Sequence, residues 1–151
     1  MSGFDRGLIA EAAAAAPDAI VALDANGVVC YWNHGAERIF GYQAHEMIGG
    51  ALDPIIPERL RDRHGEGFTD AMERGTTRYG EDDLLAVPAT TSAGKTISVE
   101  FSITLLREGD RVTHVMAILR DVTERWTHDR ETRRRLEALE AQLAASEVPS
   151  G

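Results

Sequence analysis

Residues 17–42 read PDAIVALDANGVVCYWNHGAERIFGY, and this stretch decides the fold. Two short runs rich in Val, Ile and aromatic residues flank the sequence DANG, a pattern that is typical of paired β-strands. The pair Asn26-Gly27 predicts a type I′ turn, because both central residues of that turn adopt positive φ angles that Asn and Gly tolerate. We therefore expect a β-hairpin here.

A short helix is expected directly after the hairpin. Asn33 is a good N-cap for the segment HGAERIF, whose apolar residues share one face, and Gly41 is a good stop. A second brief helical turn, QAHEMIG, should follow. Before the hairpin, residues 8–16 (LIAEAAAAA) have high helix propensity and end at Pro17. The N-terminal residues 1–16 are thus predicted to carry a helix of their own.

Residues 57–72, PERLRDRHGEGFTDAM, predict the longest helix before the second half of the chain. Pro57 suits the first helical position, and Gly75 suits the end. Apolar side chains recur at every fourth residue of this segment, and one histidine interrupts them. The stripe consists of Leu60, His64, Phe68 and Met72.

Residues 81–123 predict an antiparallel meander of three strands, separated by the turn signals SAG and REGD. In the middle strand, apolar residues alternate strictly with polar ones, so one face should be buried and the other solvated. The apolar positions are Ile97, Val99, Phe101 and Ile103. The run Glu81-Asp82-Asp83 at the start of this region is read as a solvated loop.

Residues 124–146 change to a charged, helix-forming sequence with leucines at positions 136, 139 and 143. The helix is too polar to fold alone, and its narrow leucine seam predicts pairing with a second helix. The last residues, 147–151, are expected to be a disordered tail.

Composition narrows the classes of function that the chain could have. The chain has 151 residues, 43% of them hydrophobic, which suits one globular unit. A formal net charge of −9 argues against nucleic acid or an anionic membrane as a partner. A single cysteine, no export leader and no long apolar run indicate a cytoplasmic protein. No catalytic constellation appears at a usable spacing, so we do not expect an enzyme.

Three parts of the sequence carry a family resemblance: residues 17–42, the glycines of HEMIGG and the segment MAILRDVTER. Together they resemble the PAS domain family. The resemblance covers roughly residues 16–125. It implies an α+β fold over residues 17–123: a five-stranded antiparallel sheet with short helices on one face, flanked by the N-terminal helix and by an outgoing, coiled-coil-like C-terminal helix. It also implies a sensor whose outgoing helix pairs in a homodimer and leads to an effector such as a kinase.

The segment PERLRDRH is similar to the haem-anchoring helix of the rhizobial oxygen-sensor kinases and of the direct oxygen sensor phosphodiesterases. The resemblance implies that His64 is the proximal ligand of a haem b iron. A neutral imidazole can donate a lone pair to iron, and apolar neighbours can pack on a porphyrin. Leu60, Phe68 and Met72 would supply that packing. The competing interpretation is that His64 is an ordinary core residue. The light-sensing flavin subtype of the family requires a reactive cysteine on the central helix, and this helix has none, so the resemblance argues against flavin photochemistry.

The same resemblance places the opposite, gas-binding side of the pocket on the meander strands. The position of the family's oxygen-binding arginine falls on Leu85, so the expected hydrogen-bond donor is missing. This predicts a site that favours CO or NO and binds O2 weakly, or a redox site. The further residues predicted to line it are Leu84, Phe101, Ile103, Ala117 and Leu119. The alternative is a haem-free PAS module that binds a small metabolite or serves in dimerisation.

Overall fold

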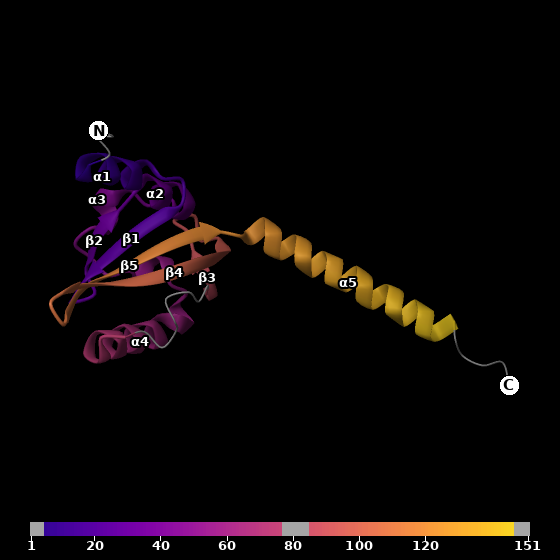
Figure 1. The fold of residues 1–151 in the computed structure, drawn as a ribbon. Helices are drawn as coiled ribbons and strands as arrows, with labels where there is room; N and C mark the ends of the chain where they lie inside the picture. The colour runs from indigo at the N-terminus through magenta and orange to yellow at the C-terminus, as the bar shows by residue number, and fades with distance from the viewer. Residues whose placement is uncertain (1–4, 77–84, 147–151) are drawn as a thin grey trace. The chain divides into compact units, whose positions relative to one another are not determined.

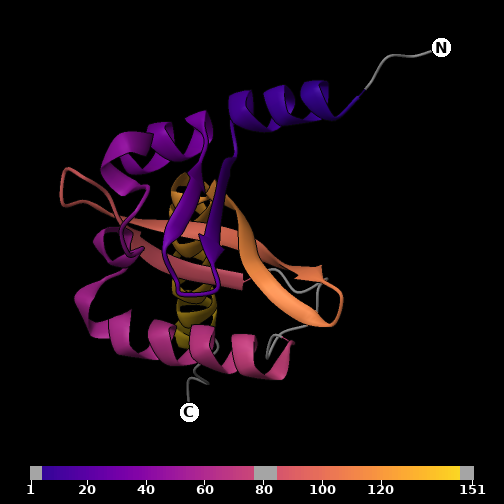
Figure 2. The ribbon, with the colours of Figure 1, turned by 90° about the vertical axis from the view of Figure 1, so that its left-hand side faces the viewer.

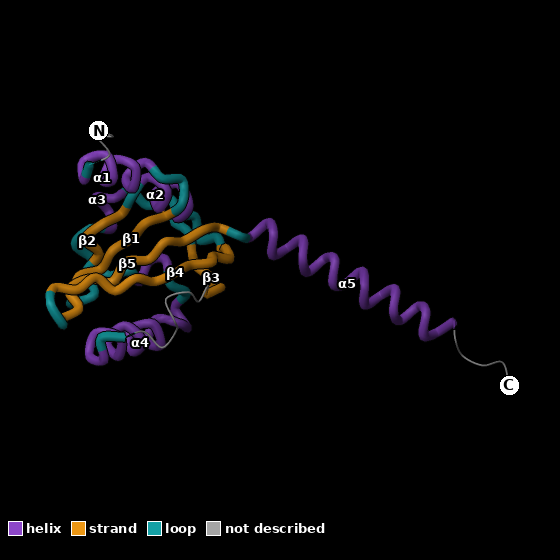
Figure 3. Tube along the Cα trace, viewed as in Figure 1, coloured by secondary structure: helices purple, strands orange, loops and turns teal. Residues whose placement is uncertain are grey.

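The computed structural model describes residues 5–76 and 85–146, and it contains a five-stranded antiparallel sheet (Figures 1 and 3). The strands lie in the order β2-β1-β5-β4-β3, so the last strand of the chain pairs with the first at the centre of the sheet. Their bounds are β1 Ala19–Asp24, β2 Val29–Trp32, β3 Leu85–Thr90, β4 Thr96–Glu108 and β5 Arg111–Asp121. The predicted α+β class and the predicted meander are confirmed.

Helices lie between β2 and β3 in the sequence, one further helix precedes β1 and another follows β5 (Figure 2). The α-helices are α1 Arg6–Ala15, α2 His34–Phe40, α3 Ala44–Met47, α4 Arg61–Arg74 and α5 Thr123–Ser146, and two 3-10 turns are η1 Asp53–Ile55 and η2 Glu58–Leu60. Asn33 caps α2 by accepting from the Ala36 amide at 2.9 Å, and Gly41 ends that helix in the left-handed region, as predicted.

The β1–β2 hairpin is confirmed, but the predicted type I′ turn is wrong. Among the described residues, only glycines adopt a positive φ, so Asn26 does not have the angle that a type I′ turn requires. Gly27 alone does, at φ 78°. The Asp24 carboxylate explains the difference, because it accepts from the amides of Asn26 at 2.8 Å and Val28 at 3.1 Å and holds a wider turn.

The start of the helix that carries His64 also differs from the prediction. Pro57 precedes the 3-10 turn η2 rather than opening the α-helix, and α4 begins only at Arg61. The Arg61 side chain stabilises this entry by donating through Nε to the carbonyls of Asp53 and Ile56, at 3.2 and 3.1 Å. The helix ends at Gly75, with φ 68°, as predicted.

The core lies on one face of the sheet, which we call the inner face. Strand register places the odd-numbered residues of β3, of β4 up to Leu105 and of β5 from Val115 on this face together with Ala19, Val21 and Leu23 of β1. Residues of α2, α3 and η1 complete one continuous core cluster with them, including Phe40, Met47 and Ile55. Trp32 packs against Phe40 with ring centroids 5.6 Å apart. The predicted one-sided burial of the meander is therefore confirmed.

The chain divides into two compact units, residues 1–121 and 122–151. The second contains α5, in which no described residue is buried. The predicted domain limits at residues 16, 123 and 146 stay predictions, and the predicted tail, 147–151, lies outside the described residues. Within the part of the chain that the structure describes, no helix is long and apolar enough to cross a membrane.

Candidate functional site

The stripe predicted on α4 and its entry turn is only partly buried. Leu60, Phe68 and Met72 are half-buried, whereas His64 keeps an exposed surface. Phe68 packs near the β1–β2 turn, since a Cβ placed on Gly27 would lie 3.4 Å from its Cε1 atom. Leu60 and Phe68 also pack against the core cluster. Leu60 and Phe68 therefore extend the apolar core, whereas His64 between them stays exposed.

His64 is exposed on α4, and its imidazole is only partly shielded from solvent. The surrounding protein lowers the pKa of His64 below its ordinary value, and the negative charge of Asp53 partly opposes this effect. Within the described ranges, the side chain of His64 makes no hydrogen bond. A neutral imidazole with a free lone pair is what a metal requires of a histidine ligand. Sequence reasoning missed Asp53, because nothing in the spacing indicates that η1 folds back toward α4.

The sheet supplies a second apolar lining on the inner face. Leu85, Phe101 and Leu119 lie directly opposite one another on β3, β4 and β5. Ile103 and Ala117 form the next row. Phe101 and Ala117 pack against the same core cluster as Leu60 and Phe68. The structure thus brings at least four of the predicted lining residues to one core, from two separate parts of the chain.

Burial is uneven along this inner face. Ile97, Val99 and Leu119 are buried, with 8% or less of their surface exposed. Phe101, Ile103, Leu105, Val115 and Ala117, which continue the same face, are only half-buried. These half-buried apolar side chains are candidates for the lining of a ligand site.

Of the two leucines predicted on the gas-binding side, only one lies among the described residues. Leu85 is the first residue of β3 and is half-buried on the inner face, whereas Leu84 lies outside the described residues, as do Glu81, Asp82 and Asp83. Met116 pairs with Thr104 on the opposite face from Ala117, in agreement with the alternation.

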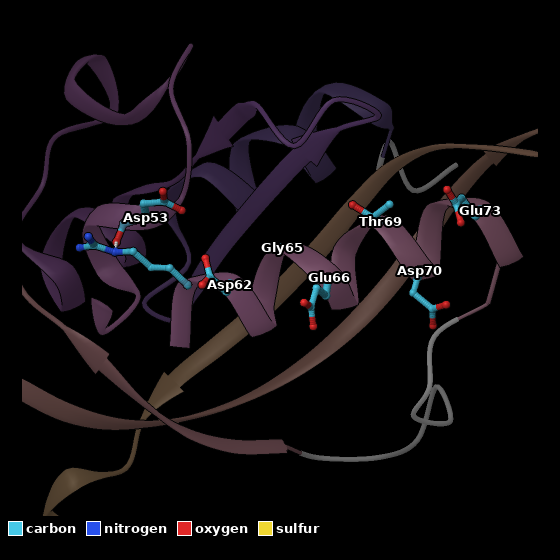
Figure 4. A pocket seen from close by; sticks show the side chains of 8 residues that line it. Asp53, Asp62, Gly65, Glu66, Thr69, Asp70 and Glu73 are labelled. Carbon is cyan, nitrogen blue, oxygen red and sulfur yellow. Dashed lines mark hydrogen bonds between the residues drawn. The ribbon is translucent and has the colours of Figure 1, made fainter. Parts of the chain in front are cut away.

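A groove of about 740 Å³ runs along the other side of α4 (Figure 4). It contains none of the predicted site residues. Five carboxylates and a single guanidinium line it, and the full lining is Asp53, Arg61, Asp62, Gly65, Glu66, Thr69, Asp70 and Glu73. A haem carries two carboxylates of its own, so this acidic groove is unsuited to hold one.

The remaining histidines lie apart from the stripe. His34, His45 and His128 are exposed, whereas His114 is half-buried and its Nδ1 lies 2.9 Å from Thr113 Oγ1. No group of three or more His, Cys, Asp or Glu side chains within the described ranges is arranged to hold a metal ion. Any metal at His64 would therefore need to bring its own ligands, as a porphyrin does.

A sheet with a one-sided apolar core, packed against short helices and followed in sequence by a long exposed helix, defines a small α+β domain. A model of the family described as the PAS fold matches residues 13–126, and the chain belongs to this family. It is thus a PAS module of the kind found in signalling proteins.

Two curated relatives are similar to this chain. The oxygen sensor protein DosP of Escherichia coli is 27% identical over 80% of the chain and 15% of the relative. The sensor protein FixL of Bradyrhizobium diazoefficiens is 26% identical over 84% of the chain and 24% of the relative. The chain therefore spans less than a quarter of the length of these larger proteins.

Solved structures support the fold. A structure of an RNA-binding light-oxygen-voltage receptor superimposes with a TM-score of 0.70 at 25% sequence identity. The match covers 91% of this chain and 40% of that one. An oxygen sensor and a light-oxygen-voltage receptor thus both lie among the similar proteins, so membership of the family leaves the cofactor open.

Proposed function

We propose that this chain is a haem-binding PAS sensor module for a gas or redox signal, with His64 as the proximal ligand of haem b. The observation that carries the proposal is the position of His64: an imidazole without a side-chain hydrogen bond in the described ranges, set in an otherwise half-buried apolar stripe. The likeness to DosP and FixL, named as an oxygen sensor and a sensor, supports it.

The other residues would hold the porphyrin by apolar contact. Leu60, Phe68 and Met72 would pack on the His64 side, and Leu85, Phe101, Ile103, Ala117 and Leu119 on the sheet side. Haem, when bound, supplies an iron that takes diatomic gases. The chain's contribution is an apolar environment, which lowers the local dielectric around the ligand and excludes water.

The gas preference follows from the sheet side. Leu85, Phe101 and Ile103 carry no hydrogen-bond donor in their side chains. O2 needs such a donor more than CO does, so we expect preference for CO or NO and weak binding of O2. The signal would pass to an effector such as a kinase through α5, in a homodimer.

A haem-free module is the second candidate, and one observation favours it. His64 keeps exposed surface, and a small metabolite or a protein partner could use the half-buried inner face without any metal. We assign no catalytic residue in either case.

Haem titration of the purified chain tests the proposal. A Soret band at one haem per chain is expected for the wild type, and His64→Ala should lose it while the domain stays folded. His45→Ala, a change to an exposed histidine on α3, is the matched control and should bind haem normally. An unchanged ferrous spectrum in His64→Ala would exclude His64 as the ligand.

A further inference from the structure

The helix α4 is not held in place by burial or by its own helix propensity. None of its 14 residues is buried. A Cβ atom added at Gly65 or Gly67 would meet nothing within 4 Å, so close packing does not require either glycine. Glycine inside a helix lowers its stability relative to alanine, and a helix of this length is marginal in water on its own. The contacts along α4 and at its two ends therefore decide how firmly it is held.

The first half of α4 is anchored to the rest of the domain. Arg61 fastens the entry of the helix to the carbonyls of Asp53 and Ile56. Leu60 and Phe68 pack against the core cluster. From this anchor the helix runs toward the β4–β5 hairpin (Figure 2).

The C-terminal end of α4 is held by a side chain of that hairpin. The guanidinium of Arg107 donates through Nη2 to the carbonyl of Gly75, the residue that ends the helix. A Cβ atom added at Gly75 would lie 3.2 Å from Arg107 Nη1 and 3.9 Å from Val112 Cγ2. A cation at this position satisfies a helix carbonyl and opposes the negative end of the helix dipole. We call the contact of Arg107 and Val112 with Gly75 the latch.

A β-bulge builds the latch. Leu106 of β4 pairs with His114, but the next residue, Arg107, pairs with Val112, so that Thr113 is an extra residue in β5. The Thr113 hydroxyl donates to the Leu106 carbonyl at 3.3 Å. Because of the extra residue, Val112 leaves the face that it would share with His114 and is buried opposite Arg107, with 5% of its surface exposed. Bulges redirect side chains in this way, and here the redirected side chain contacts the end of α4.

We propose that α4 is a strap that opens at its C-terminal end. Release of the latch lets the helix unwind back toward Gly67 and Gly65 and uncovers Phe68. Phe68 belongs to the apolar lining proposed above, so the latch controls how a ligand reaches that lining. The opening requires no haem and would serve a haem-free module equally. Haem titration therefore tests the cofactor, and amide exchange in the ligand-free chain tests the strap.

Hydrogen–deuterium exchange of the ligand-free chain, followed by mass spectrometry, measures the opening. Arg107→Ala should speed the exchange of the amides of residues 69–76 by roughly three- to tenfold, because it removes a charged donor from the helix C-terminus. Arg111→Ala, a change to an exposed arginine of the same hairpin, is the matched control and should leave this exchange unchanged. Equal exchange in Arg107→Ala and the wild type, or equal acceleration by both variants, would overturn the proposal.

The two glycines give a test in the opposite direction. Gly65→Ala combined with Gly67→Ala should slow exchange in α4 by about tenfold or more, because alanine favours the helix and meets no neighbour at either position. In the wild type, α4 should exchange at least roughly tenfold faster than the centres of β1 and β5, since local opening precedes global unfolding. An α4 that is protected as strongly as these strands, or a double variant with unchanged exchange in α4, would refute the strap.

Discussion

The side-chain amide of Asn33 donates to the backbone carbonyl of Ala13 at 2.8 Å, across 20 residues of sequence. The same nitrogen donates to the carbonyl of Asp18 at 3.0 Å. The side-chain oxygen of Asn33 accepts from the backbone amides of Ile20 and Ala36, at 2.8 and 2.9 Å. One buried side chain, only 3% exposed, thereby fastens the end of α1, the start of β1 and the start of α2.

Asn33→Ala should therefore destabilise the domain strongly. The change removes an N-cap and leaves buried backbone groups without partners, and we expect a loss of about 2–4 kcal/mol in the free energy of unfolding. Urea denaturation measures it. Asn26→Ala, in the exposed part of the β1–β2 turn, is the control and should change stability by less than about 0.5 kcal/mol. Equal stabilities for the two variants would contradict the role given to Asn33.

Cys30 should react slowly for an exposed thiol. Partial burial and the nearby Asp24 carboxylate raise the pKa of Cys30, and its Sγ lies 3.5 Å from the Ala22 carbonyl. Only the thiolate reacts, so alkylation by a neutral reagent at pH 8 should be slower than that of a small free thiol and should rise with pH.

Asp24→Asn should speed this alkylation by roughly two- to threefold, because it removes a negative charge that opposes ionisation. Asp18→Asn, at the other end of β1, should leave the rate unchanged. A faster reaction in both variants would point to loosening of the strand rather than to electrostatics.

Removing the residues after Thr123 should separate dimerisation from the pocket. Residues 1–121 form a compact unit that contains every predicted haem contact. We expect the shortened chain to sediment with a weaker tendency to dimerise and to keep the haem spectrum of the full chain. A changed spectrum would mean that α5 contributes to the site.

The fold was predictable because local signals and the core pattern agree. Asn33 and Gly41 bracket α2, and the alternation of Ile97, Val99 and Phe101 fixes which face of β4 is buried. The type of the turn at Asn26 was not predictable from the Asn-Gly pair, because the Asp24 carboxylate selects the turn through hydrogen bonds that the pair does not encode.

The candidate site was predictable only in part. Spacing placed Leu60 and Phe68 on one stripe, and alternation placed Phe101 and Ala117 on one strand face. Their meeting at one core depends on tertiary packing. The approach of Asp53 to His64 depends on the path of the chain through η1 and η2, for which no periodic pattern exists.

Leu85→Arg gives the sharpest test of the gas preference. Leu85 lies opposite Phe101 on the inner face, and an arginine there would add a donor beside the bound gas. A charged hydrogen bond contributes about 1.5–3 kcal/mol, so O2 affinity should rise by one to two orders of magnitude while CO affinity changes little. Ala86→Arg places the same charge on the opposite face of β3 and should leave both affinities unchanged. Equilibrium gas titrations of the ferrous proteins measure this, and tight O2 binding by the wild type would mean that another donor reaches the iron.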